Sequence, residues 1–215
     1  MMRVERIPAW LAETNAYLVV SDTGEGLLID APPDPDEIGK HIARHDVPIV
    51  GIVLTHGHVD DTGGAGKLAA GSGAVTYVHP DDDYLTLHPS EQLRMMFGMT
   101  PPGSYEVPDR IESLEHGQVL DFSGVSLEVR HTPGHTPGHC CFYWEDEGSL
   151  FSGDQLFAGS IGRTDLPGGS FQQLVDSMRD QVMTLDDDVL VLPGHGPETT
   201  IGRERAMNPF REEWS

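Results

Sequence analysis

The first half of the chain alternates short apolar runs with turns. Residues 15–20 (NAYLVV) and 26–30 (GLLID) are rich in large apolar side chains, and the Asp22-Thr23-Gly24 turn between them predicts a hairpin. Residues 49–54 (IVGIVL) are almost wholly apolar, which is typical of a strand buried on both faces in a sheet that helices cover. Around these strands the pattern predicts helices at residues 34–44 and 63–70 and another strand at residues 74–78.

The second half begins with a weakly patterned stretch and then becomes rich in strands. Residues 81–115 predict a lid or loop with short helices near Tyr84 and Met95. Its apolar side chains either line a pocket or pack against the body; they are Leu93, Met95, Met96, Phe97 and Met99. A second sheet is predicted from strands at 125–130, 140–144, 149–152 and 189–192, with a helix capped by Ser170 at 170–183. The chain is therefore expected to be α/β, with helices outside two sheets.

Composition and charge narrow the class of protein. The 215 residues are 38% hydrophobic with 25 Gly and 16 Pro, which is typical of a globular fold, and we expect one domain over residues 1–215. The formal net charge of −22 argues against nucleic acid and anionic membrane surfaces as partners. The acidic runs at 81–83 and 186–188 are interpreted as solvated faces.

The chain start and the cysteines indicate a cytoplasmic protein. Charged residues at Arg3, Glu5 and Arg6 interrupt the first segment, so it does not resemble a secretory signal. The sequence contains no apolar run of membrane-spanning length. The two cysteines, Cys140 and Cys141, are adjacent and are expected to be core residues of a strand in a reducing compartment.

Histidines and aspartates in the turns after apolar runs form the strongest chemical signal. His56 and His58 follow the apolar run at 49–54, and Asp60 follows them in the same turn. Two imidazoles and a carboxylate at this spacing can converge on one cation at a strand end, where ligands usually bind in α/β sheets. The sequence therefore predicts a metal site here.

Three further turns are expected to reach the same edge. In HTPGHTPGH the Pro and Gly residues exclude a helix, and His135 is chosen as the ligand because the Thr-Pro-Gly turn flanks it on both sides. His131 and His139 are assigned supporting roles. Asp154, in Ser-Gly-Asp, and His195, in Pro-Gly-His-Gly, also follow apolar strands.

At these residues the chain resembles the metallo-β-lactamase superfamily, and within it the short glyoxalase II-like hydrolases. Asp30, the His-x-His-x-Asp turn, Thr-Pro-Gly-His, Ser-Gly-Asp and Pro-Gly-His-Gly occur in family order over nearly the whole chain, and the run at 159–165 is similar to the glyoxalase-like branch. The resemblance implies an αββα sandwich with two mixed sheets. It also implies a metal centre in which His56, His58 and His135 hold a first ion, Asp154 bridges, and Asp60 and His195 hold a second. Arg163 and Asp165 would fix their loop.

Asp61 departs from the family pattern, which has a histidine ligand of the second metal at this position. Aspartate is shorter, so it reaches the ion only if the loop allows. If it does, the second site contains Asp60, Asp61, Asp154 and His195, an oxygen-rich set that suits Mn²⁺ or Fe²⁺. The residues at 198–215 are too few for the helical region that holds glutathione in full-length glyoxalase II, which leaves the thiol carrier open.

The expected activity is hydrolysis of a small-molecule thioester or related ester. The cofactor is one or two Zn²⁺ ions, with Fe²⁺ or Mn²⁺ as alternatives, and the metal activates water that Asp60 or Asp154 orients. One alternative is a mononuclear iron oxidoreductase of the persulfide dioxygenase kind, with His58, His135 and Asp154 as its ligands. Another is a catalytically impaired metal-binding homologue, because Asp61 replaces a ligand. The sequence does not indicate an oligomeric state.

Overall fold

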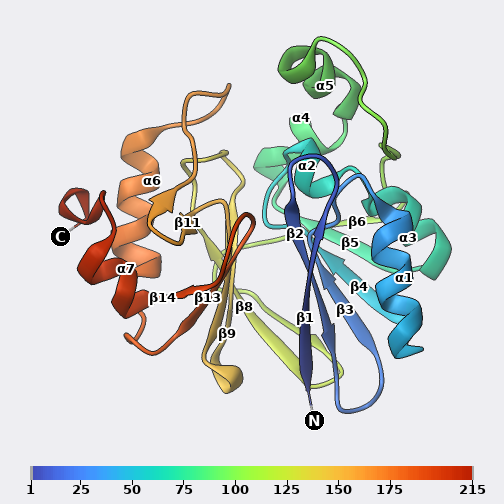
Figure 1. Ribbon diagram of the computed structural model, residues 1–215, viewed down its shortest axis with the longest axis horizontal. Helices are drawn as coiled ribbons and strands as arrows, with labels where there is room; N and C mark the ends of the chain where they lie inside the picture. The colour runs from blue at the N-terminus through green and yellow to red at the C-terminus, as the bar shows by residue number, and fades with distance from the viewer. Residues whose placement is uncertain (1, 215) are drawn as a thin grey trace.

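A mixed six-stranded sheet forms the N-terminal layer of the computed structural model, which describes residues 2–214 (Figure 1). Its strands lie in chain order: β1 (Arg3–Ala9), β2 (Thr14–Val20), β3 (Gly26–Ile29), β4 (Ile49–Val53), β5 (Val75–Val78) and β6 (Ile111–Ser113). The first three strands pair antiparallel, and β3 to β6 pair parallel. Met1 and Ser215, the ends of the expected domain, lie outside the described residues.

A second mixed six-stranded sheet packs against the first. Its order is β14 (Thr199–Thr200), β13 (Leu190–Pro193), β10 (Ser149–Gly153), β9 (Cys140–Trp144), β8 (Val125–His131) and β7 (Val119–Phe122). Only the pair β10 and β13 is parallel. A small hairpin, β11 (Leu156–Phe157) and β12 (Ser160–Ile161), follows β10.

Helices cover the outer face of each sheet (Figure 1). On the first sheet these are α1 (Pro35–His45) and α3 (Ala65–Ser72), and on the second α6 (Phe171–Ser177), the π-helical turn η3 (Met178–Val182) and α7 (Ile201–Met207). Three short helices lie at one end of the first sheet: α2 (Val59–Thr62), α4 (Asp83–Thr86) and α5 (Pro89–Phe97). Single turns complete the described chain at η1 (Pro80–Asp82), η2 (Glu145–Glu147) and η4 (Arg211–Glu213).

Buried side chains form three apolar layers. The layer between the sheets includes Tyr17, Val53, Phe142 and Trp144, and its tightest aromatic contact joins Tyr17 to Phe151, with ring centroids 5.4 Å apart. The other two layers lie between each sheet and its helices. Because strand side chains alternate between faces, each sheet can be apolar on both sides. This is the αββα sandwich of two mixed sheets that the sequence predicted.

The differences from the predicted elements have local causes. Strand β1 was not predicted, because Arg3–Ala9 is an edge strand whose charged side chains lie largely outside the core. The helix predicted at 170–183 ends as α6 at Ser177 and continues as a π-helical turn. Helix α7 was also missed, since its seven residues include two buried ones, Ile201 and Glu204, too few to form a periodic pattern. The two short helices near Tyr84 and Met95 are confirmed as α4 and α5.

The ends of several strands meet at the edge that α2 borders. Backbone atoms join the sheets there: the amide of Asn15 donates to the Gly194 carbonyl at 2.8 Å, and the amide of Cys140 donates to the Thr55 carbonyl at 2.7 Å. Tyr17, from the first sheet, donates its hydroxyl to the Pro193 carbonyl of the second at 2.8 Å. The turns that follow β4 and β13 are thereby each fixed to the opposite sheet. Among residues 2–214 no helix combines the length and apolarity needed to cross a membrane.

Candidate metal centre

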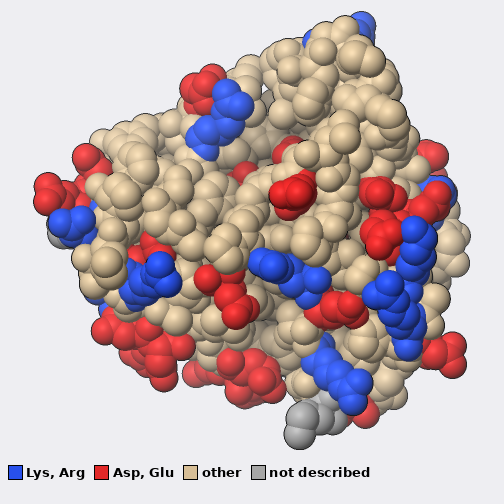
Figure 2. Space-filling view, in the orientation of Figure 1, with Lys and Arg blue, Asp and Glu red and all other residues tan. Residues whose placement is uncertain are grey.

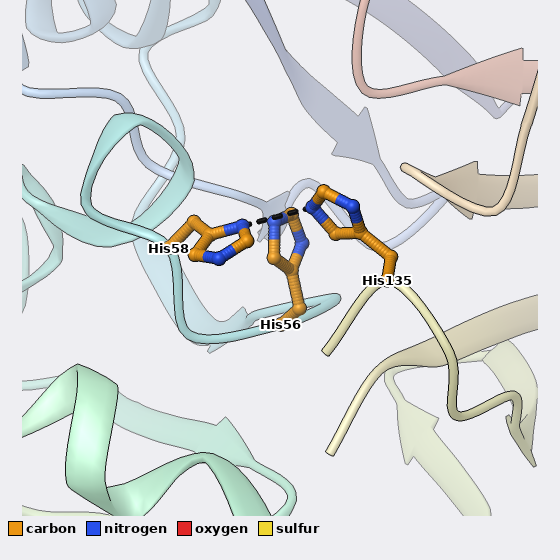
Figure 3. Close-up of side chains that lie close together, drawn as sticks. All are labelled: His56, His58 and His135. Atoms are coloured by element: carbon orange, nitrogen blue, oxygen red, sulfur yellow. Dashed lines mark hydrogen bonds between the residues drawn. The ribbon is translucent and has the colours of Figure 1, made fainter. Parts of the chain in front are cut away.

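Three histidines from two distant turns point toward a common centre (Figure 3). His56 and His58 follow β4, and His135 lies in the turn between β8 and β9. Nδ1 of His58 lies 2.8 Å from Nε2 of His135, and the rings of His56 and His135 have centroids 4.7 Å apart. One nitrogen of each ring lies within 4.8 Å of the others. Since a tetrahedral ion with bonds of about 2.0–2.1 Å holds its ligands roughly 3.3 Å apart, this arrangement is that of a three-imidazole metal site.

Asp154 connects this group to a second one. Its Oδ2 lies 3.5 Å from Nε2 of His135 and 3.7 Å from Nε2 of His195. Nε2 of His195 also lies 3.6 Å from Oδ2 of Asp60. One carboxylate oxygen thus faces donors of both groups, which is the position of a bridging ligand between two cations.

Asp61 lies with both groups. It is fully buried, and its Oδ2 is 3.3 Å from Nε2 of His56. Its carboxylate lies within 4.8 Å of ligand atoms of His56 and Asp154. It also lies within 4.8 Å of ligand atoms of Asp60 and His195. The aspartate therefore reaches the donor set in spite of its short side chain, without any movement of the loop.

Hydrogen bonds fix which ring nitrogen is free in His56 and in His135. The Thr55 hydroxyl donates to Asp30 at 2.9 Å, so it accepts from Nδ1 of His56 at 2.9 Å. Nδ1 of His135 donates to the Arg163 carbonyl at 2.7 Å. Both rings are therefore protonated on Nδ1, and their Nε2 lone pairs face the centre. Such outer hydrogen bonds orient metal-bound imidazoles and raise their basicity.

Burial holds the histidines of the first group neutral. It lowers the pKa of His58 and of His135 to about 4, and that of His56 well below its usual value with the help of the neighbouring imidazoles. A neutral imidazole is the form that binds metal. At neutral pH the three rings are ready to coordinate without first losing a proton.

Two carboxylates of the site, those of Asp154 and Asp61, resist ionisation. Burial raises the pKa of Asp154 to about 6, and burial together with the charge of Asp60 raises the pKa of Asp61 well above its usual value. Burial also opposes ionisation of Asp60, but the hydrogen bond and charge of His195 outweigh it and lower the pKa of Asp60. Three carboxylates this close together, two of them buried, require positive charge to be stable as anions.

Buried polar atoms without a hydrogen-bond partner show whether the residues of the centre suit a metal ion. Four buried atoms in the centre make no hydrogen bond: Nε2 of His56, both carboxylate oxygens of Asp61, and Oδ1 of Asp154. Buried donors and acceptors without a partner are rare in folded proteins, and each one needs an explanation. A divalent ion ligated by these nitrogens and oxygens satisfies them together, so the residues present fit a metal centre.

Asp82 corrects the prediction that the acidic run at 81–83 is a solvated face. Asp81 and Asp83 are exposed, but Asp82 is fully buried. Its Oδ2 accepts from the Gly57 amide at 2.8 Å and the Thr136 hydroxyl at 2.7 Å, and its Oδ1 accepts from the Gly138 amide at 2.7 Å. Asp82 thus joins the turn of His56 and His58 to the turn of His135.

Gln92, on α5, is a second support that the sequence did not reveal. It accepts from the Val59 amide at 3.1 Å and donates to the carbonyls of Gly57 and Leu85, both at 2.9 Å. The hydrophobic pattern of α5 gives no hint of this role, since the partners are backbone atoms 33 and 35 residues away.

The supporting residues predicted from the sequence lie at different distances from the centre. His139 is buried, and its Nε2 accepts from the Asp154 amide at 3.1 Å. His131 lies farther out, stacked on His79 with ring centroids 4.0 Å apart. Arg163 and Asp165 form a two-point ion pair of 2.7 and 2.8 Å on an exposed loop, and the Arg163 carbonyl binds His135. Both cysteines are buried in β9, as predicted.

The centre opens to solvent on the side of His195. The side chains of His195 and Asp60 are 27% and 17% exposed, whereas those of His56 and Asp61 are fully buried. His195 also borders a cavity of about 290 Å³ at the tip of the β1–β2 hairpin. The face over α4 and α5 carries few charged side chains (Figure 2), and Met95, Phe97 and Met99 are exposed on α5 and the loop after it. A substrate would therefore meet Asp60 and His195 first.

A family comparison agrees with this geometry. The model of the metallo-beta-lactamase superfamily matches residues 10–195, a span that runs from the β1–β2 hairpin to the last of the converging histidines. The chain belongs to the metallo-β-lactamase superfamily. In this superfamily member, the sandwich and the histidine and aspartate donors at its edge are parts of one metal-binding architecture.

Individual relatives are similar over almost their full length. The hydroxyacylglutathione hydrolase GloC of Haemophilus influenzae is 34% identical over 97% of this chain and 98% of its own. The crystal structure of the BLEG-1 B3 metallo-beta-lactamase superposes with a TM-score of 0.89 and 32% identity, over 97% of this chain and 99% of its own. TTHA1623, solved in a di-iron-bound form, has a TM-score of 0.85 and 34% identity over 96% and 99%. The names of these three proteins indicate different activities or metals, so the chemistry of this chain must be argued from its own site.

Proposed function

We propose that this metallo-β-lactamase-superfamily chain hydrolyses small-molecule thioesters or related esters at a two-metal centre. In this proposal His56, His58 and His135 hold the first ion, Asp154 bridges, and Asp60, Asp61 and His195 complete the second position. The observation that carries it is the convergence of these seven side chains, with unpartnered ligand atoms, at one solvent-facing edge. The ions are Zn²⁺, with Fe²⁺ or Mn²⁺ as the alternatives.

The centre has the parts that ester hydrolysis needs. Divalent ions bound there supply a polarised carbonyl and a water of lowered pKa. Asp60, ionised beside His195, accepts a hydrogen bond from the attacking water and orients it toward the carbonyl carbon. Asp154, whose Oδ2 lies 3.5 Å from Nε2 of His135 and 3.7 Å from Nε2 of His195, would bridge the two ions. No covalent enzyme intermediate is required, and both thiols are buried away from the opening.

The surroundings of the opening favour a substrate with an uncharged portion. Met95, Phe97 and Met99 are exposed on α5 and the loop after it, and α5 adjoins the site through the bonds of Gln92 to Gly57 and Val59. Flexible methionines suit varied apolar groups. The similarity to GloC along nearly the whole chain supports a thioester as the bond that is cleaved. We therefore propose an acyl thioester of a small thiol as the substrate class.

The experiment compares three reactions on the protein loaded with Zn²⁺ and, separately, with Fe²⁺, because Zn²⁺ has no redox chemistry. S-D-Lactoylglutathione and acetyl-coenzyme A test thioester hydrolysis, nitrocefin tests β-lactam hydrolysis, and oxygen uptake with glutathione persulfide tests the mononuclear iron oxidoreductase. Thioester turnover that is lost in the His58→Ala variant supports the proposal. Oxygen uptake without thioester turnover would assign the site to the alternative with His58, His135 and Asp154. Inactivity in all three assays with metal bound would favour the impaired homologue.

A further inference from the structure

Asp61 is unusual among the buried acids of this protein because neither of its oxygens has a hydrogen-bond partner. Asp30, also buried, accepts from the amide and the hydroxyl of Thr55 at 2.8 and 2.9 Å. Asp82 accepts three hydrogen bonds. A buried carboxylate without compensating partners is strongly unfavourable. No neighbouring group of the protein donates a hydrogen bond to the Asp61 carboxylate. Its buried position therefore points to a bound partner that is not part of the polypeptide.

The location of Asp61 limits what that ligand can be. Within 4.8 Å its carboxylate meets His56 and Asp154 on one side, and Asp60 and His195 on the other. These neighbours are imidazoles and carboxylates, and Asp61 forms one group with Asp60 and His195 in which the ligand atoms all lie within 4.8 Å of one another. An anionic ligand would face several carboxylates here, so the ligand is a cation.

We propose that Asp61 is a metal ligand and that it makes the second position an oxygen-rich site, formed by Asp60, Asp61, Asp154 and His195, that is tuned toward hard divalent cations. Three carboxylates and one imidazole resemble the donors that Mn²⁺ accepts, whereas the three-imidazole first position suits Zn²⁺ or iron. The inference rests on the metal centre of the proposed function, but not on its substrate.

Charge supports a filled second position. With His195 neutral as a metal ligand, one divalent ion leaves the three carboxylates of Asp60, Asp61 and Asp154 incompletely neutralised, whereas two divalent ions more than balance them. An imidazole in place of Asp61 would remove one negative charge and one hard donor. By the Irving–Williams order a nitrogen-rich site binds Zn²⁺ more tightly than Mn²⁺. With aspartate at position 61, we expect this difference in affinity to be smaller.

The test measures metal binding directly, without any substrate. Metal-stripped protein receives one equivalent of Zn²⁺ to fill the first position, and the second position is then titrated separately with Mn²⁺ and with Zn²⁺. Calorimetry and the electron paramagnetic resonance signal of free Mn²⁺ report the two affinities. We expect the ratio Kd(Mn)/Kd(Zn) to be at least about tenfold larger in Asp61→His than in the parent protein.

Two further variants keep the test decisive. Asp61→Asn preserves the shape but removes the charge, so we expect it to weaken Mn²⁺ binding at the second position at least about tenfold while one equivalent of Zn²⁺ still binds tightly. Asp36→His makes the same change at an exposed site and should leave both affinities as they are. An unchanged Mn²⁺ affinity in Asp61→Asn, or an unchanged ratio in Asp61→His, would overturn the proposal. Because no ester is involved, a failure of the thioesterase assay leaves this result standing.

Discussion

The carboxylate of Asp82 accepts a hydrogen bond of 2.8 Å from the amide of Gly57, the residue between two of the converging histidines. With its bonds to Thr136 and Gly138, the same carboxylate also holds the turn that contains His135. The first metal position is thus assembled by one side chain, from η1, that never touches the metal donors.

Substitution of Asp82 tests this connection. In Asp82→Asn one carboxylate oxygen becomes an amide nitrogen, which cannot accept from a backbone N–H. At least one buried donor then loses its partner, and we expect a loss of about 1–3 kcal/mol in unfolding free energy. The affinity for the first metal ion should fall as well, because the two turns separate. Denaturant unfolding and metal titration measure the two effects. The exposed neighbour provides the control, and Asp83→Asn should change neither; equal effects of both variants would contradict the role of Asp82.

Thr55 links Asp30 to His56, so its hydroxyl should matter for metal affinity rather than for packing. Thr55→Val keeps the shape but frees the His56 ring to rotate and to change its tautomer. We expect metal affinity to drop about 10–100-fold, the range typical of lost outer hydrogen bonds. Competition with a chromophoric chelator measures it. Thr76→Val is a matched control, because the Thr76 hydroxyl is buried without a partner and its removal should leave metal binding intact.

Removal of the metal should destabilise the folded protein. The ion binds only the assembled centre, so at a free concentration 1,000 times Kd it contributes about 4 kcal/mol of stability. For a chain of this length that corresponds to a fall in Tm of roughly 10 °C after chelation. Differential scanning calorimetry with chelator, and again after metal is restored, checks the value. His58→Ala should abolish the metal-dependent shift, whereas the exposed His88 can be replaced by alanine without losing it.

The Glu5 carboxylate provides a pH-dependent contact far from the metal. Partial burial favours its neutral form, but hydrogen bonds and charges from His41 and His45 outweigh burial and lower its pKa. A lowered pKa means that the folded state favours the ionised form. This contribution to stability is present above the ordinary glutamate pKa of 4.5 and is lost as pH falls through the lower folded value.

The Glu5→Gln variant should therefore be less stable than the parent at pH 6, with a difference in Tm that shrinks as pH falls from about 4.5 toward 3. Thermal unfolding across this range measures the difference. Glu13→Gln, at an exposed position, is the matched control. A Glu5→Gln difference that grows on acidification would contradict the assignment.

The converging donors were predictable because each follows an apolar strand in the sequence. His56, His58, Asp154 and His195 stand directly after β4, β10 and β13, and parallel strands deliver the residues after them to one edge. The sequence did not indicate, by contrast, which side chains hold these turns together. Asp82 is the middle residue of three aspartates, and nothing in that run separates the buried side chain from the two exposed ones. Gln92 was hidden for a similar reason, since its partners are backbone groups that carry no sequence signal.

The alternation of side chains along β9 gives each side of the second sheet its own thiol. Cys140 belongs to the layer between the sheets and Cys141 to the layer under α6, and both are fully buried. A thiol reagent can reach either one only when its layer opens. Single-cysteine versions of the chain would thus report the opening of the two layers separately, and equal labelling rates would indicate that the sandwich unfolds as one cooperative unit.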